Sequence, residues 1–182
     1  MNESLEEARE LALQKIGRNL VNLQKLEGML KQLLATHDLQ GHPSTLASSA
    51  KRKADKASKM TLGQVIRELG ATLFEHSSVF QGRLELSDEP WLSAKLTLEG
   101  GAEVANQWQG DMSMIVAARN DLVHHMLVSF DPNSIDSCKA LSAALDTQRE
   151  QLLPILEHVR SLVLAQKEAL EDIQRDLDAP GS

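Results

Sequence analysis

The sequence contains no tyrosine, one cysteine, two tryptophans and three phenylalanines among its 182 residues. A core with so few aromatic residues must be built mainly from Leu, Val, Ile and Ala, which favours packed helices over a β-sandwich. Cys138 has no second cysteine with which to form a disulfide, so we interpret it as a small packing residue. No apolar run approaches the roughly 20 residues that a membrane span needs. The acidic start MNESLEEARE is unlike a signal peptide, and we expect a cytoplasmic protein that does not enter a membrane.

Length and charge narrow the class of protein further. A chain of 182 residues with 42% hydrophobic and 25% charged residues is expected to fold as a single domain, residues 1–182, around one core. The net charge of −7 excludes a strongly basic nucleic-acid-binding coat. Any polyanion must therefore be bound by a local patch of positive charge.

Four stretches have apolar residues at the three- and four-residue spacing of helices. Thr61 and Gln64 have the spacing of a capping box, and Asn133 with Asp136 is interpreted as a second helix start. Pro154 lies inside the last stretch and predicts a kink or a short break there. The predicted helices cover 3–36, 61–76, 102–128 and 133–172.

Residues 79–98 change to a period of two and predict a β-hairpin, in which the segment LEL is followed by the turn SDEP and by alternating apolar residues up to Leu98. Trp91 and Trp108 are assigned to the core. The predicted fold is thus mainly α, an antiparallel bundle of about four helices, two of them long, with a small hairpin.

Residues 37–59 have Gly, Pro and Ser but little apolar spacing, and we interpret them as a flexible loop. His37 and His42 would then be in solvent. The loop carries a basic run that could guide RNA, although a solvated loop explains the same run. Because the basic run has no interleaved aromatic residues on which bases could stack, we do not expect it to recognise a particular base sequence. The candidate RNA-binding residues are Lys51, Arg52, Lys53 and Lys56.

The third predicted helix ends in the segment ARNDLVHHML, residues 118–127. Arg119, the polar Asn120 and His124 resemble the signature of the HEPN superfamily, in which an arginine, usually followed by a polar residue, precedes a histidine with four to six residues between them. The resemblance implies a helical bundle, a homodimer whose two motifs face each other across a cleft, and, in many members, a metal-independent endoribonuclease of toxin or defence type. It implies no metal and no cofactor.

Arg119, Asn120 and His124 are the candidate catalytic residues. RNA cleavage without a metal needs a group that takes the 2'-hydroxyl proton and one that protonates the leaving oxygen, and histidine is suited to both. A guanidinium can hold two phosphate oxygens at once, so Arg119 is the expected stabiliser of the transition state. Asn120 would position the phosphate or orient His124, four residues on.

The spacing of the motif raises a geometric difficulty. On a regular helix, Arg119 and His124 would lie about 140° apart, too far to meet one phosphate. Three solutions are open: a bulge in the helix near Asp121, an Arg119 side chain that wraps around, or a dimer that combines residues of two chains. The HEPN resemblance favours the dimer.

One branch of the superfamily has a tyrosine two residues after the histidine, where its antitoxin modifies it, but this chain has Met126 there. That mode of regulation is therefore excluded, whereas an antitoxin of another kind, or an unidentified protein partner, stays open. A second hypothesis also fits the residues: a non-catalytic helical interaction protein in which the motif closes a dimer interface.

Overall fold

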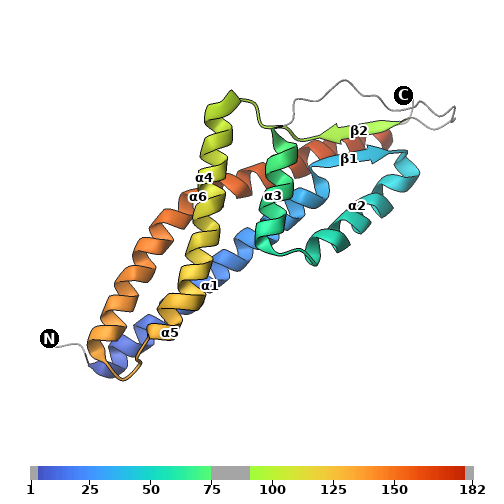
Figure 1. Cartoon of the computed structure of the whole chain (residues 1–182). Helices are drawn as coiled ribbons and strands as arrows, with labels where there is room; N and C mark the ends of the chain where they lie inside the picture. The colour runs from blue at the N-terminus through green and yellow to red at the C-terminus, as the bar shows by residue number, and fades with distance from the viewer. Residues whose placement is uncertain (1–3, 75–90, 179–182) are drawn as a thin grey trace. The chain divides into compact units, whose positions relative to one another are not determined.

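The computed structural model describes residues 4–74 and 91–178 of the chain (Figure 1). It is mainly helical with a small antiparallel two-stranded sheet, as predicted. In chain order the elements are α1 (Leu5–Thr36), β1 (Asp38–Gly41), α2 (Pro43–Ser58), α3 (Leu62–Leu73), β2 (Leu92–Lys95), α4 (Gly101–Asp121), the π-helical turn η1 (Leu122–Met126), α5 (Leu127–Ser129) and α6 (Ile135–Asp178). No helix in the described ranges is both long enough and apolar enough to span a membrane.

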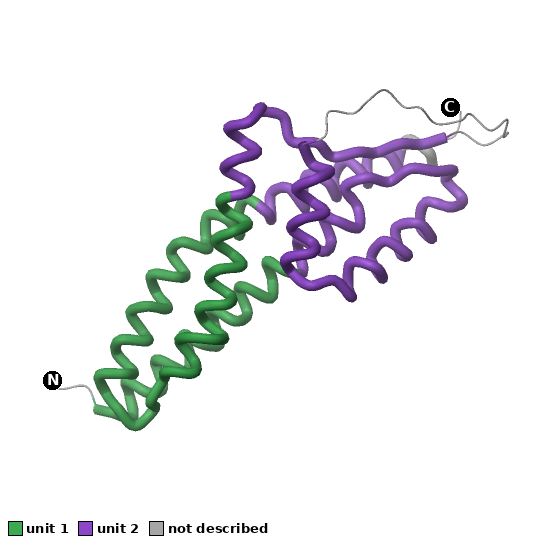
Figure 2. The backbone as a smooth tube through the Cα atoms, in the orientation of Figure 1, with its two compact units in different colours: residues 1–27, 110–158 green, residues 28–109, 159–182 purple. Residues whose placement is uncertain are grey.

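The chain divides into two compact units (Figure 2). Unit 1 combines residues 1–27 with residues 110–158, and unit 2 combines residues 28–109 with residues 159–182. The helices α1, α4 and α6 contribute to both units, while α2, α3 and the sheet belong to unit 2.

Unit 1 is built from three helical segments. Asp146 of α6 contacts Lys15 and Arg18 of α1, and Gln148 contacts Asn19, so α1 and α6 run in the same direction. The α4 segment runs opposite to both (Figure 1). The predicted antiparallel packing is thus found for α4. It is not found between α1 and α6, which are separated along the chain by several other elements.

The end of unit 1 near the N-terminus has a small core of its own. Ala8, Ala12 and Cys138 are buried together, and Phe130 and Ile135 pack against them. The interpretation of Cys138 as a packing residue is confirmed, since its side chain is completely buried. Small residues at these positions allow α1 and α6 to approach closely.

Two helix starts in the structure show how local sequence sets the boundaries. Thr61 caps α3 with the predicted capping box, in which its Oγ1 accepts from the Gln64 N–H and Gln64 Oε1 accepts from the Thr61 N–H. At α6 the cap is Ser134 rather than Asn133, because Ser134 Oγ accepts a hydrogen bond from the Ser137 N–H. Of the kink or short break predicted at Pro154, the break is not found, because α6 runs through this residue as one helix.

The prediction of a flexible loop at 37–59 is wrong, because most of these residues form β1 and α2. Pro43 occupies the first turn of α2, where its fixed φ suits a helix and its missing N–H is no loss. The inward positions are Leu46, Ser49, Ala50, Lys53 and Ala57, which are half-buried or buried. Small residues and a lysine stem give this helix a buried face without the apolar pattern that signals one.

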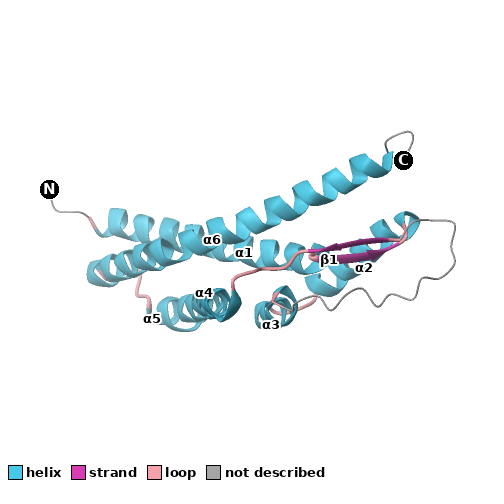
Figure 3. Ribbon diagram, turned by 90° about the horizontal axis from the view of Figure 1, so that it is seen from above, coloured by secondary structure: helices cyan, strands magenta, loops and turns pink. Residues whose placement is uncertain are grey.

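The sheet also differs from the predicted hairpin. The strand β2 lies inside the predicted second strand, but it pairs with β1, with Asp38 opposite Lys95 and Gly41 opposite Leu92 (Figure 3). The predicted first strand falls largely on residues 75–90, outside the described residues. The prediction failed because the alternation of apolar residues identifies a strand but not its partner, which here lies about 50 residues earlier.

The two tryptophans have different environments in unit 2. Trp108 is 3% exposed and makes an edge-to-face contact with Phe74, so its assignment to the core is confirmed. Trp91 is 41% exposed, and the edge-to-face contact of its ring with His42 has a centroid distance of 5.2 Å. Its assignment to the core is therefore wrong.

Candidate active site at a π turn in unit 1

The predicted motif lies at a change of helix type. Arg119 and Asn120 belong to the last turn of α4, whereas His124 lies in the π turn η1. In this turn the Leu127 N–H donates to the Leu122 carbonyl oxygen, five residues back. Of the three solutions left open by the sequence, a distortion of the helix near Asp121 is therefore present, beginning at the next residue.

A π turn changes the direction in which the following side chains point. It has more residues per turn than an α-helix, so each residue rotates the chain by a smaller angle. Arg119 and His124 are consequently less than the 140° apart that a regular helix would impose. Leu122, between them, stays fully buried and holds the turn against the core of unit 1.

The three motif side chains are exposed. Arg119 Nη1 donates a hydrogen bond of 3.3 Å to Asn120 Oδ1, so the structure brings these two residues together. The His124 side chain makes no hydrogen bond or ion pair with any other residue in ranges 4–74 and 91–178. Its imidazole is free to meet a ligand or a second chain.

A hollow of about 470 Å³ lies in unit 1 between the end of α4 and α6. Asp121 and Met126 line it together with residues of α6, but Arg119, Asn120 and His124 do not. The motif residues therefore do not line this hollow.

A buried chain of amide groups supports the backbone just before the motif. Asn19 is fully buried and donates from Nδ2 to the Leu145 carbonyl at 2.8 Å and to Gln148 Oε1 at 3.1 Å. Gln148, 5% exposed, donates from Nε2 to the Ala118 carbonyl at 2.9 Å. The network links α1, α6 and α4 at the residue preceding Arg119.

Sequence analysis missed this network, although the sequence contains a signal for it. Asn19 stands seven residues after Ala12 and seven before Leu26, both buried, and Gln148 stands between Leu145 and Leu152 on the apolar face of α6. A polar residue within a heptad-spaced apolar stripe is a candidate for a buried hydrogen bond.

A charged cluster on the same two helices lies close to this network. Lys15 Nζ contacts Asp146 Oδ2 at 2.6 Å, and Arg18 Nη2 contacts Asp146 Oδ1 at 2.9 Å. The hydrogen bonds from Lys15 and Arg18 lower the pKa of the Asp146 carboxyl below its ordinary value, because they stabilise the ionised form. The Asp146 carboxylate is thus paired with the Lys15 and Arg18 side chains.

The four candidate RNA-binding residues lie on α2 in unit 2 and do not form one set of free cations. Lys51 and Arg52 are exposed. Lys53 donates from Nζ to the Asp38 carbonyl, and Lys56 pairs with Glu68 at 3.3 Å. Lys51 and Arg52 are thus the two of the four that are exposed and make no ion pair in the described part of the chain, and RNA binding by α2 stays a prediction.

The prediction that His37 is in solvent is wrong. It is 6% exposed, and its Nδ1 lies 2.9 Å from the Leu34 carbonyl oxygen. Burial lowers the pKa of His37 below its ordinary value, because the charged imidazolium loses its hydration. The prediction failed because residues 37–59, which it took for a loop, mostly form β1 and α2.

Within residues 4–74 and 91–178, no three His, Cys, Asp or Glu side chains gather in a way that could hold a metal ion, and no ion pair joins Asp121 to His125. The exposed motif at the π turn is thus the candidate functional site.

In comparisons with known proteins, no family model, no curated protein and no solved structure matches the chain significantly.

Proposed function

We propose that this chain is a HEPN-like, metal-independent endoribonuclease of toxin or defence type that works in the cytoplasm as a homodimer. The observation that carries the proposal is the placement of Arg119, Asn120 and His124, which are all exposed at a π turn. Insertions of this kind into α-helices occur frequently at functional sites, where they redirect side chains.

The proposed reaction uses the 2'-hydroxyl of the RNA itself. A histidine takes the proton of that hydroxyl, its oxygen forms a bond to phosphorus, and the bond from phosphorus to the 5'-oxygen breaks. A second group, which acts as the general acid, then protonates the leaving 5'-oxygen. The products are a 2',3'-cyclic phosphate and a free 5'-hydroxyl, and no metal or redox partner is required.

The motif residues divide these tasks. His124 serves as the general base or the general acid, and the same histidine of a second copy takes the other task. Arg119 holds two non-bridging phosphate oxygens as charge develops on them. Asn120, which accepts a hydrogen bond from Arg119, fixes the direction of the guanidinium.

Two observations support a homodimer as the active form. Arg119, Asn120 and His124 are all exposed and do not line the hollow beside them, so a second chain placed against them would enclose a phosphate. Val128, four residues after His124, is 78% exposed, and this apolar side chain is suited to contact with another chain. An antitoxin or another protein partner would act by covering the same surface.

The test is cleavage of RNA by purified wild-type protein in the presence of a metal chelator, followed by analysis of the fragment ends. We expect cyclic phosphate ends from the wild type and none from Arg119→Ala or His124→Ala, both of which should remain dimers. His125→Ala is the matched control, since His125 is exposed on the same turn but lies outside the motif.

The same variants test the non-catalytic alternative, in which the motif only closes a dimer interface. On that hypothesis the wild type leaves RNA intact, and Arg119→Ala and His124→Ala shift the dimer equilibrium. Cleavage that survives in both variants would exclude the proposed active site.

A further inference from the structure

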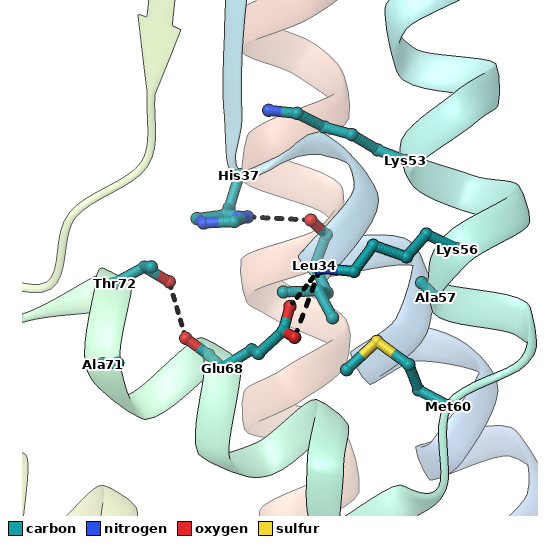
Figure 4. Close-up of a pocket in the computed structure, with 9 residues that line it drawn as sticks. All are labelled: Leu34, His37, Lys53, Lys56, Ala57, Met60, Glu68, Ala71 and Thr72. Atoms are coloured by element: carbon teal, nitrogen blue, oxygen red, sulfur yellow. Dashed lines mark hydrogen bonds and ion pairs between the residues drawn. The ribbon is translucent and has the colours of Figure 1, made fainter.

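A pocket of about 320 Å³ lies within unit 2, where the end of α1 meets α2 and α3 (Figure 4). Its volume falls in the lower part of the range typical of small-molecule sites. It is independent of the motif at the π turn, which belongs to unit 1.

One part of the pocket wall is apolar. Leu34, 8% exposed, and Ala57, 2% exposed, are held in the core, and Met60 contributes a half-buried thioether side chain. Methionine adapts its shape to varied apolar ligands because its side chain is unbranched and polarisable. This wall suits a hydrocarbon or aromatic group.

A neutral histidine stands among these groups. The Leu34 carbonyl oxygen can only accept a hydrogen bond, so His37 Nδ1 must be the donor in their 2.9 Å contact. This contact fixes the tautomer of the neutral ring, and Nε2 carries a lone pair. Nε2 has no partner within the described ranges, so a ligand that enters the pocket is free to contact it.

The charges around the pocket do not cancel. Lys56 Nζ lies 3.3 Å from both carboxylate oxygens of Glu68, so this pair is neutral as a whole. Lys53 reaches from α2 toward His37 and donates to the Asp38 carbonyl oxygen (Figure 4). No carboxylate pairs with Lys53 in the described part of the chain, which leaves one positive charge without a counter-ion.

We propose that this pocket binds a small monocarboxylate with an apolar body, whose carboxylate is held by the Lys53 ammonium and whose body lies against Leu34, Ala57 and Met60. One unpaired ammonium matches one negative charge. A phosphate monoester carries nearly two charges and would lose more hydration free energy on entering these apolar walls. The half-buried position of Lys53 also suits a small anion better than an RNA backbone.

The binding experiment uses octanoate as the probe, with octanol and acetate as matched compounds that lack the charge or the apolar chain. Titration of the wild-type protein, followed by calorimetry and by the imidazole NMR signals of His37, should show saturable 1:1 binding of octanoate. Octanol and acetate should bind at least about tenfold more weakly, since each lacks one of the two recognised features.

Substitutions locate the site. Lys53→Met keeps the length and apolar stem of the side chain but removes the charge, and should weaken octanoate binding by roughly tenfold or more. Lys51→Met is the control, because Lys51 is exposed on the same helix and does not line the pocket. Ala71→Met, at an exposed position of the pocket rim, should block binding without unfolding the protein, as its melting temperature will show.

Three results would overturn the proposal. Octanol that binds as tightly as octanoate would show that charge has no part in recognition. Octanoate binding that is unchanged in both Lys53→Met and Ala71→Met would place the ligand elsewhere. Absence of octanoate binding to the wild type would show that the pocket does not take this class of ligand.

Discussion

The side-chain amide of Gln148 donates a hydrogen bond of 2.9 Å to the carbonyl oxygen of Ala118, the residue that precedes Arg119. Because Gln148 also accepts from Asn19, the position of the α4 backbone beside the motif is fixed from two other helices. The candidate catalytic side chains are thus exposed, while the backbone that carries them is anchored by a buried network. Such support is what a site requires if its groups are to be held in a productive geometry.

Loss of Gln148 should destabilise unit 1. Gln148→Leu leaves the Asn19 amide and its neighbours with unsatisfied buried groups, which costs about 1–3 kcal/mol of the free energy of unfolding. Urea unfolding monitored by circular dichroism measures this loss. Gln151→Leu, at an exposed position of α6, should leave the free energy nearly unchanged.

The double variant Asn19→Leu/Gln148→Leu distinguishes a network from two separate contacts. Removing both side chains eliminates the unpaired amide that either single change leaves in the Asn19–Gln148 contact, so the double variant should be more stable than the sum of the single losses predicts. Additive losses would mean that the two amides act independently.

Because Asp146 pairs with Lys15 and Arg18, we expect the protein to lose stability in acid. The pKa of Asp146 is lowered in the folded state by Lys15 and Arg18, so its stabilising effect is present above the ordinary carboxyl range, near pH 4. This effect is lost as the pH falls through the lowered folded value, since the folded state must then accept a proton. Asp146→Asn should reduce the difference in stability between pH 7 and pH 3, whereas Glu150→Gln, at an exposed position on the same helix, should not. An equal difference in wild type and Asp146→Asn would contradict the prediction.

From the burial of His37 we expect a second dependence of stability on pH, in a different pH range. Burial lowers the pKa of His37 in the folded state, so below about pH 6.5 the unfolded chain takes up a proton that the folded protein excludes. Stability should therefore decrease as the pH falls from 7 toward 5. Melting temperatures across this range should fall less steeply in His37→Gln than in the wild type, and His125→Gln, at an exposed histidine, should retain the wild-type slope.

Arg119→Lys tests the geometric part of the guanidinium's role. Lysine keeps the positive charge but cannot hold two phosphate oxygens with a planar pair of donors. Removing one stabilising donor from a transition state typically costs about 10²- to 10³-fold in rate. We expect a loss in this range in single-turnover RNA cleavage with the dimer intact. A lysine variant as active as the wild type would show that charge alone is needed at this position.

Periodicity predicted the elements whose buried residues are large and apolar. The helix α1 is such an element, whereas the cap of α3 at Thr61 is predicted by the capping-box spacing of Thr61 and Gln64. The helix α2 was missed because its buried face consists mainly of alanine, serine and the stem of Lys53. The pairing of β1 with β2 depends on segments far apart in the chain, which no local pattern encodes.

For the candidate site, the residue spacing was informative beyond the motif itself. The angle between Arg119 and His124 on a regular helix indicated that the helix could be distorted, and the structure has a π turn there. The anchoring of Ala118 by Gln148 could not be predicted, since it depends on how α6 packs against α4. The pocket near Lys53 was also missed, because α2 had been interpreted as a loop.

The decisive measurement is the first-order rate of cleavage of one defined RNA, in the presence of a chelator, by the wild type and by His124→Ala and His125→Ala. Loss of a general acid or base typically costs 10²- to 10⁴-fold, so we expect His124→Ala to be slower by about that factor. His125→Ala should retain nearly the wild-type rate, because it removes a neighbouring imidazole from the same turn. Equal rates in His124→Ala and the wild type would show that the exposed motif at the π turn is not the site of RNA cleavage.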